Sequence, residues 1–167
     1  DQYGGDALND VAIEDAVTAS RPRKPRAQYL RDKVQIRLAR DEMGAAIAGI
    51  LKENGIELPG ADWSQIFPHW LIACDGDNVI GCAMVLPAKP VGYCEFLVVR
   101  PSLSFKLRAI AIRQLIISAM ATVHAGKAAY FGALVDVKND KFTGVLTKLN
   151  FVKISDHRML VKKLVTL

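Results

Sequence analysis

Cysteine is scarce in this chain of 167 residues, and no two cysteines form a C-x-x-C pair. The three that are present, Cys74, Cys82 and Cys94, each lie in an apolar stretch with the character of a strand. An odd number of unpaired cysteines excludes a small fold held together by disulfides and is typical of buried, reduced thiols. We therefore expect a reducing compartment such as the cytoplasm.

Clustered histidines and long apolar runs are also lacking. His69, His124 and His157 lie far apart and have neither i, i+4 nor Cys-His spacing, so no metal site is predicted. No apolar run approaches the ~20 residues of a transmembrane helix, and residues 1–10 lack the basic and apolar regions of a signal peptide. We expect no association with a membrane.

Positive charge exceeds negative charge, but unevenly along the chain. Lys and Arg number 22 against 17 Asp and Glu, a net charge of +5 that favours anionic partners. Residues 1–32 differ from the rest: an acidic stretch precedes residues 21–26, which read RPRKPR, and prolines disfavour a helix there. We predict an N-terminal basic arm, flexible or bound to a partner. That partner is a protein assembly or, on charge alone, nucleic acid.

Residues 33–167 have the pattern of one globular domain. Val34–Leu38 alternates apolar and polar residues, which predicts a half-buried strand, and an amphipathic helix follows until Gly55. Turn residues 75–78 separate two strands, at 70–74 and 79–86, and so predict a hairpin.

An almost entirely apolar strand at residues 92–100 stops at Pro101. The remaining pattern predicts helices at 107–123 and 139–149 and strands at 128–135, 151–154 and 159–164. A strand–helix–strand crossover makes its two strands parallel, whereas hairpins are antiparallel. The order predicts an α/β (α+β) domain whose mixed, mostly antiparallel sheet has helices on both faces and one parallel central pair.

Four segments, residues 34–41, 77–83, 95–101 and 139–151, resemble in their order the GNAT superfamily of acyl-coenzyme A N-acyltransferases. The resemblance covers about residues 33–164. It implies that the two parallel central strands splay apart and that the pantetheine arm of acetyl-coenzyme A lies between them. The arm would pair with the backbone of Leu97, Val98 and Val99.

The resemblance further implies a pyrophosphate-binding turn with the pattern Arg/Gln-x-x-Gly-x-Gly/Ala. The nearest match is residues 108–113, and it departs from the pattern because no glycine occurs between Pro101 and Ala125. Glycine lets a phosphate approach the backbone closely. Alanines stand in this stretch instead, and basic side chains can supply charge. The implied phosphate contacts are Lys106, Arg108, Ala109, Ala111 and Arg113.

Asn139 matches an asparagine that contacts the cofactor arm in the family, and it equally fits the N-cap of the following helix. Glu95 lies where some members carry a general base, and strand alternation predicts that it shares a face with Leu97 and Val99. A solvated or ion-paired Glu95 is the alternative.

The family's frequent general acid, a tyrosine, corresponds to Leu146, so Tyr130 or Tyr93 would have to take that role. The chain thus resembles an enzyme that moves an acetyl group from acetyl-coenzyme A to a small-molecule or protein amine. The missing glycines and tyrosine leave an alternative: a GNAT-like domain without catalysis that serves as a structural or interaction module in an assembly.

Overall fold

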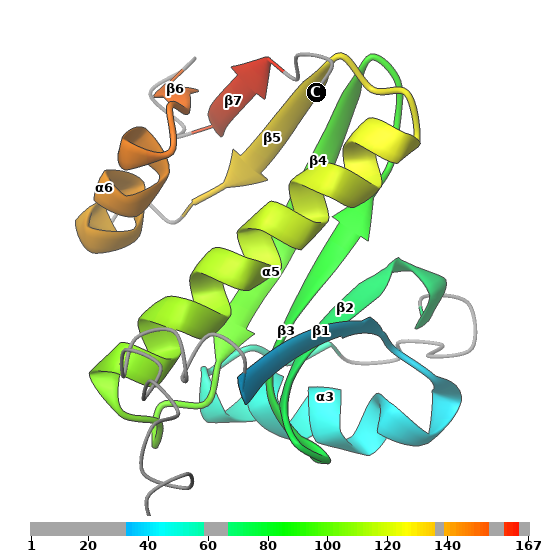
Figure 1. The fold of residues 1–167 in the computed structure, drawn as a ribbon, viewed down its shortest axis with the longest axis vertical. Helices are drawn as coiled ribbons and strands as arrows, with labels where there is room; N and C mark the ends of the chain where they lie inside the picture. Colours follow the sequence, from blue (N-terminus) through cyan, green and yellow to red (C-terminus); the bar gives the residue numbers. More distant parts are fainter. Residues whose placement is uncertain (1–32, 59–66, 136–138, 154–158, 164–167) are drawn as a thin grey trace, which may run out of the picture.

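The structure is a computed structural model that describes residues 33–58, 67–135, 139–153 and 159–163 (Figure 1). The predicted basic arm, residues 1–32, lies outside this part of the chain. The described residues form a single mixed sheet with helices on both of its faces, which confirms the predicted fold class.

Seven described strands make up the sheet in the order β1-β2-β3-β4-β5-β7-β6. Only β4 and β5 pair in parallel; every other neighbouring pair in this order is antiparallel. The bounds are β1 Val34–Leu38, β2 Trp70–Asp75, β3 Asn78–Leu86, β4 Val91–Val99, β5 Tyr130–Leu134, β6 Val152–Lys153 and β7 Met159–Lys163.

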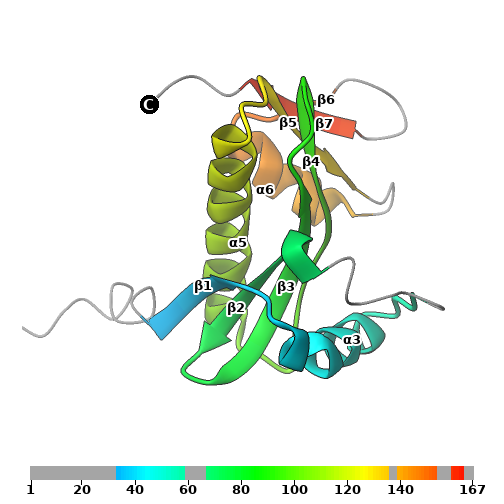
Figure 2. The same cartoon turned by 90° about the vertical axis from the view of Figure 1, so that its right-hand side faces the viewer.

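Three α-helices of the described ranges lie against this sheet. Helix α3 (Gly44–Glu53) covers one face near β2 and β3, whereas α5 (Phe105–Ala125) and α6 (Asp140–Lys148) cover the other (Figures 1 and 2). Two 3-10 turns, η1 (Asp41–Met43) and η2 (Phe67–His69), precede α3 and β2.

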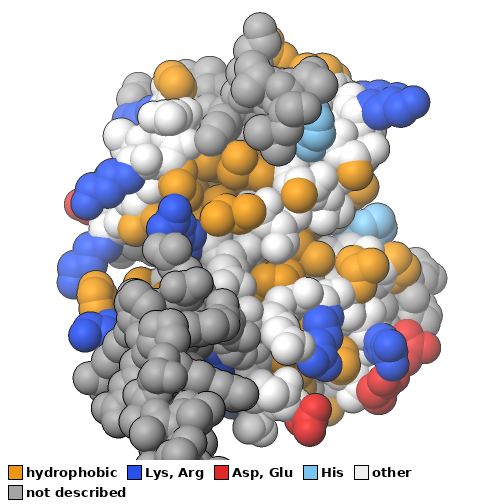
Figure 3. Space-filling view, in the orientation of Figure 1, with side chains coloured by type: hydrophobic (Ala, Val, Ile, Leu, Met, Phe, Trp, Pro, Cys, Tyr) orange, Lys and Arg blue, Asp and Glu red, His pale blue; other side chains and the backbone are white. Residues whose placement is uncertain are grey.

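The core has two parts because helices cover both faces. The larger cluster joins α5 and α6 to the sheet and contains Leu115, Ile116, Phe131 and Leu146, each at most 1% exposed. The smaller one joins α3 to β2 and β3 around the fully buried Trp70. On the face that α5 and α6 form, apolar side chains gather along the middle, whereas lysine and arginine side chains lie mainly toward the margins (Figure 3).

Helix α5 begins two residues earlier than its apolar pattern predicted. Ser104 caps it: the Ser104 Oγ accepts a hydrogen bond from the Leu107 backbone N–H at 3.4 Å. Within the described chain, α5 is the one helix with the length and apolar composition to cross a membrane. The central helix of a globular domain also passes that test, and α5 buries Leu115, Ala119 and Val123 against the sheet.

The end of β4 is fixed to α3 and β3 by polar contacts. Arg100 donates its backbone N–H to the Ile80 carbonyl at 2.9 Å and its Nε to the Val79 carbonyl at 3.0 Å. Its guanidinium also forms an ion pair with Glu53 of α3. These contacts set the direction in which the chain leaves β4 and enters α5.

Candidate functional site

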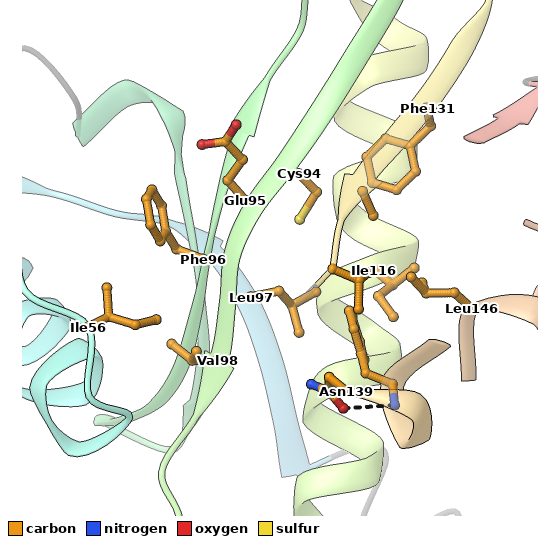
Figure 4. Close-up of a pocket in the computed structure, with 13 residues that line it drawn as sticks. Ile56, Cys94, Glu95, Phe96, Leu97, Val98, Ile116, Phe131, Asn139 and Leu146 are labelled. Carbon is orange, nitrogen blue, oxygen red and sulfur yellow. Dashed lines mark hydrogen bonds between the residues drawn. The ribbon is translucent and has the colours of Figure 1, made fainter. Parts of the chain in front are cut away.

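The parallel strands β4 and β5 separate part-way along their length. Their pairing runs from Val91↔Tyr130 to Cys94↔Ala133, and in the described sheet residues 95–99 of β4 have no partner on β5. A cavity of about 500 Å³ lies where the strands diverge (Figure 4). The residues that line it are Ile56, Cys94, Glu95, Phe96, Leu97, Val98, Ile116, Phe131, Ala133, Val135, Asn139, Phe142 and Leu146.

A β-bulge in β4 begins at the same place. The pairing with β3 jumps from Met84↔Glu95 to Cys82↔Val98, so two residues of β4 stand opposite one residue of β3. Phe96, one of the two, has a φ of 51°, which bulky side chains rarely adopt. Its ring stacks on Trp70 with centroids 6.2 Å apart. Bulges bend a strand and redirect its side chains, which accounts for the departure of β4 from β5.

The bulge places Glu95 on a different face from the one that alternation predicted. Phe96 and Val98 pack with the α3 cluster, whereas Leu97 and Val99 pack with the α5 cluster. Glu95 lies on the α3 side, on the same side of β4 as Phe96 and Ile56, and Leu97 points the other way (Figure 4). The prediction that Glu95, Leu97 and Val99 share a face was wrong, because one extra residue reverses the alternation.

The start of α5 lies just beyond the end of β4. The backbone N–H groups of Phe105 and Lys106 precede the first helical hydrogen bond, which Arg108 donates to the Ser104 carbonyl at 3.0 Å. Unpaired N–H groups and the helix dipole favour an anion here. Lys106 is exposed, and the Nε of Arg108 is buried with no hydrogen-bond partner among the residues that the structure describes.

Residues 108–113, expected to form a phosphate-binding turn, are instead helical. Ala111 is fully buried against the sheet, and Ala109 and Arg113 lie on exposed positions of the second and third turns. The turn itself is residues 100–104. The free N–H groups that follow it belong to Phe105 and Lys106, the first two residues of α5. The sequence signal that locates this start is Ser104, a favoured N-cap residue directly before the apolar run.

No protein-family model and no curated protein matches the sequence. Solved structures do resemble the fold. N-acetylglutamate synthase from Neisseria gonorrhoeae, complexed with coenzyme A and L-arginine, matches 78% of this chain with a TM-score of 0.66 and 15% identity. Ard1 from Thermoplasma volcanium matches 80% with a TM-score of 0.65 and 11% identity, and the NatC complex bound to Gag peptide and coenzyme A matches 80% with 0.63 and 14%. The chain has the GNAT fold. It covers 99% of the matched Ard1 and NatC chains but only 33% of the synthase chain.

The opening of this GNAT fold is lined by the N-cap of α6, Asn139, and by Phe142 and Leu146 of the helix itself. Asn139 caps the helix, because its Oδ1 accepts a hydrogen bond from the Phe142 N–H at 3.1 Å, and it also lines the cavity (Figure 4). The N-cap alternative is therefore confirmed, and a contact with a cofactor stays a prediction. Leu146 is 1% exposed and lines the cavity without a hydroxyl group.

The tyrosines lie at the closed end of the GNAT strand pair. Tyr130 stands opposite Val91, three pairs before the strands diverge, and is not among the described residues that line the cavity. Tyr93 lies opposite Gly132 of β5, and a Cβ added to Gly132 would come within 3.0 Å of the Tyr93 ring. Tyr93 is two residues from Glu95 before the bulge, so both side chains lie on the α3 side of the sheet. Tyr93 therefore lies on the same strand and the same face as Glu95, whereas Tyr130 lies on β5.

Cys94 is the thiol that lines the cavity, and it is protonated at neutral pH. Burial, with a smaller contribution from the Glu95 carboxylate, raises the pKa of Cys94 to about 12, and burial alone raises the pKa of Cys82 to about 12. A thiol that keeps its proton is a poor nucleophile. Across the described chain no three His, Cys, Asp or Glu side chains gather as a metal site.

These buried thiols predict that the protein loses stability in alkali. Above the ordinary cysteine pKa of 9.0, the unfolded thiol loses its proton while the folded thiol keeps it. The contribution of these thiols to the free energy of unfolding is then constant below about pH 9 and falls toward pH 12, by up to ~1.4 kcal/mol per pH unit for each thiol. Urea unfolding between about pH 8 and pH 10.5 measures this slope. Cys82→Ala and Cys94→Ala should each flatten it; slopes equal to that of the parent protein would contradict the assignment.

Proposed function

We propose that the domain is an N-acyltransferase that moves an acetyl group from acetyl-coenzyme A to an amine. The observation that carries this proposal is the open slot between β4 and β5, with the Glu95 carboxylate in its wall. The gonococcal synthase and the NatC complex, which share the fold, were crystallised with coenzyme A. That supports coenzyme A as the class of donor.

The donor would lie along the free edge of β4. Residues 95–99 lack a β5 partner in the described sheet, so the backbone groups of Leu97 can pair with an amide of a pantetheine arm. Val98 turns its backbone groups to β3, because Arg100 donates to Ile80 and hydrogen-bonded pairs alternate along the ladder. The Val99 carbonyl already accepts a hydrogen bond from the Asn54 side-chain amide at 3.1 Å. The diphosphate would meet the N–H groups of Phe105 and Lys106, with the Lys106 ammonium beside them.

The chemistry then follows from which side of β4 each group occupies. An ammonium that arrives next to Glu95 would give a proton to the carboxylate, and the neutral amine would attack the thioester carbonyl. A C–N bond forms, the C–S bond breaks, and the thiolate leaves with the electron pair. The attacking nitrogen loses its second proton as the amide forms. Because Leu146 has no proton to give, this proton would reach the leaving thiolate through water.

One alternative function has observations in its favour. No glycine occurs between Pro101 and Ala125, where the family pattern has it, and Leu146 stands where that pattern has tyrosine. A domain with the GNAT fold that has lost catalysis and acts as an interaction module would show the same changes. Binding of coenzyme A separates the two candidates.

Calorimetric titration with coenzyme A tests the proposal. We expect saturable binding, at least ~10-fold weaker binding of pantetheine, which lacks the diphosphate, and a loss of ~5-fold in Lys106→Ala. Lys52→Ala changes an exposed lysine on α3 and is the matched control. No heat at millimolar coenzyme A would reject the enzyme and leave the interaction module.

A further inference from the structure

The cavity is lined from both sides of β4. Cys94, Leu97 and Ile116 lie on the α5 side, whereas Glu95, Phe96 and Ile56 lie on the α3 side (Figure 4). If the donor occupies the free edge of β4, the second substrate reaches the thioester from the α3 side, where the carboxylate is. The chemistry of that side therefore describes the acceptor.

Charge on this side has one sign. Among the described residues that line the cavity, Glu95 is the only one with a carboxyl, ammonium or guanidinium group, and the Cys94 thiol keeps its proton. No lysine or arginine among them faces the opening. A cationic amine would meet a carboxylate here, whereas a carboxylate on the acceptor would lose water without gaining a partner.

The remaining surface on this side is apolar and only half-buried. Ile56, Phe96 and Val98 line the cavity itself. The same sheet face continues through Met84, which stands opposite Glu95, and through Tyr93, which stands opposite Leu86. Half-buried apolar and aromatic side chains around one carboxylate suit an ammonium joined to an apolar or aromatic group, including by cation–π contact.

We propose that the acceptor is a primary amine carried on an apolar or aromatic group, with no carboxylate beside the amine. This inference rests on the proposed acyltransferase function and narrows it. It concerns the α3 side of β4 alone, so it can fail while binding of the donor succeeds.

Two matched pairs of amines test the proposal, with acetyl-coenzyme A as donor and released thiol as the readout. Phenethylamine and phenylalanine differ only by the carboxylate, and we expect phenethylamine to have the higher kcat/KM by at least ~10-fold. Phenethylamine and ethylamine differ by the aromatic group, and we again expect at least ~10-fold in favour of phenethylamine.

The variant Ile56→Lys tests the position of the acceptor. A lysine at residue 56 would give a carboxylate a partner, so the preference for phenethylamine over phenylalanine should shrink by at least ~5-fold. Glu57→Lys places a lysine one residue further on, at an exposed position outside the cavity lining, and should leave the preference unchanged. Thermal unfolding and coenzyme A titration of both variants show whether each is folded.

Coenzyme A binding measured on the same protein separates the outcomes. If coenzyme A binds and phenylalanine or ethylamine is the better acceptor, or the amines do not differ, the inference about the acceptor is overturned and the proposed function stands. If coenzyme A binds and no amine is acetylated, both the acceptor and the transfer step are rejected. If coenzyme A does not bind, the proposed function is rejected, and the inference about the acceptor is rejected as well.

Discussion

Replacing Glu95 by glutamine should lower kcat at least ~100-fold and leave the affinity for coenzyme A unchanged. Glutamine has the size of glutamate but cannot take a proton from an ammonium. Glu95 lines the cavity on the α3 side of β4, whereas the donor would lie along the free edge of the strand. The base and the donor thus share the strand but occupy its face and its edge, so the variant should separate catalysis from donor binding. Steady-state rates and calorimetric titration measure the two effects.

Glu57→Gln is the control for this variant. It makes the same chemical change at an exposed glutamate that does not line the cavity, and it should keep the full rate. A Glu95→Gln protein with full activity would show that Glu95 is not the base. A Glu95→Gln protein that no longer binds coenzyme A would contradict the placement of the donor.

Phe131→Ala should lower the free energy of unfolding by about 3–5 kcal/mol. Phe131 is 1% exposed, belongs to the cluster beneath α5, and meets Phe151 edge-to-face with ring centroids 5.6 Å apart. Truncation removes a large apolar surface and leaves a void that the rigid sheet cannot close. Urea unfolding at neutral pH measures the change.

The neighbouring residue offers a matched control. Tyr130→Ala also removes an aromatic ring from β5, but Tyr130 is 38% exposed and lies outside the core cluster. Its loss should cost less than ~1.5 kcal/mol. Equal losses from the two variants would mean that the core does not extend under β5 as described.

Most of the architecture follows from local sequence pattern. Alternation at Val34–Leu38 predicted β1 at the residues that form it, and the polar turn before Asn78 predicted the β2–β3 hairpin. Asn139 was predicted as an N-cap and caps α6. In each case the signal lies within a few residues of the element it specifies, so neighbouring residues alone determine it.

The site depends on features that local pattern does not carry. Residues 94–99 are apolar except for Glu95, so alternation gives no sign that β4 holds an extra residue at Phe96. At the bulge, Phe96 stacks on Trp70 of another strand, a contact between residues far apart in the sequence. The start of α5 was misplaced for a related reason: Phe105 is exposed, so the apolar periodicity does not include the first turn.

The short pairing between β4 and β5 also limits the contact between the two halves of the sheet. Four residue pairs, Val91↔Tyr130 to Cys94↔Ala133, are the only described strand contacts between the β1–β4 half and the half formed by β5, β7 and β6. A ligand whose amides pair with β4 beyond Cys94 would add hydrogen bonds between the two halves and stabilise their contact. Binding in the slot would then raise the stability of the sheet, and a more stable sheet would bind the ligand more tightly.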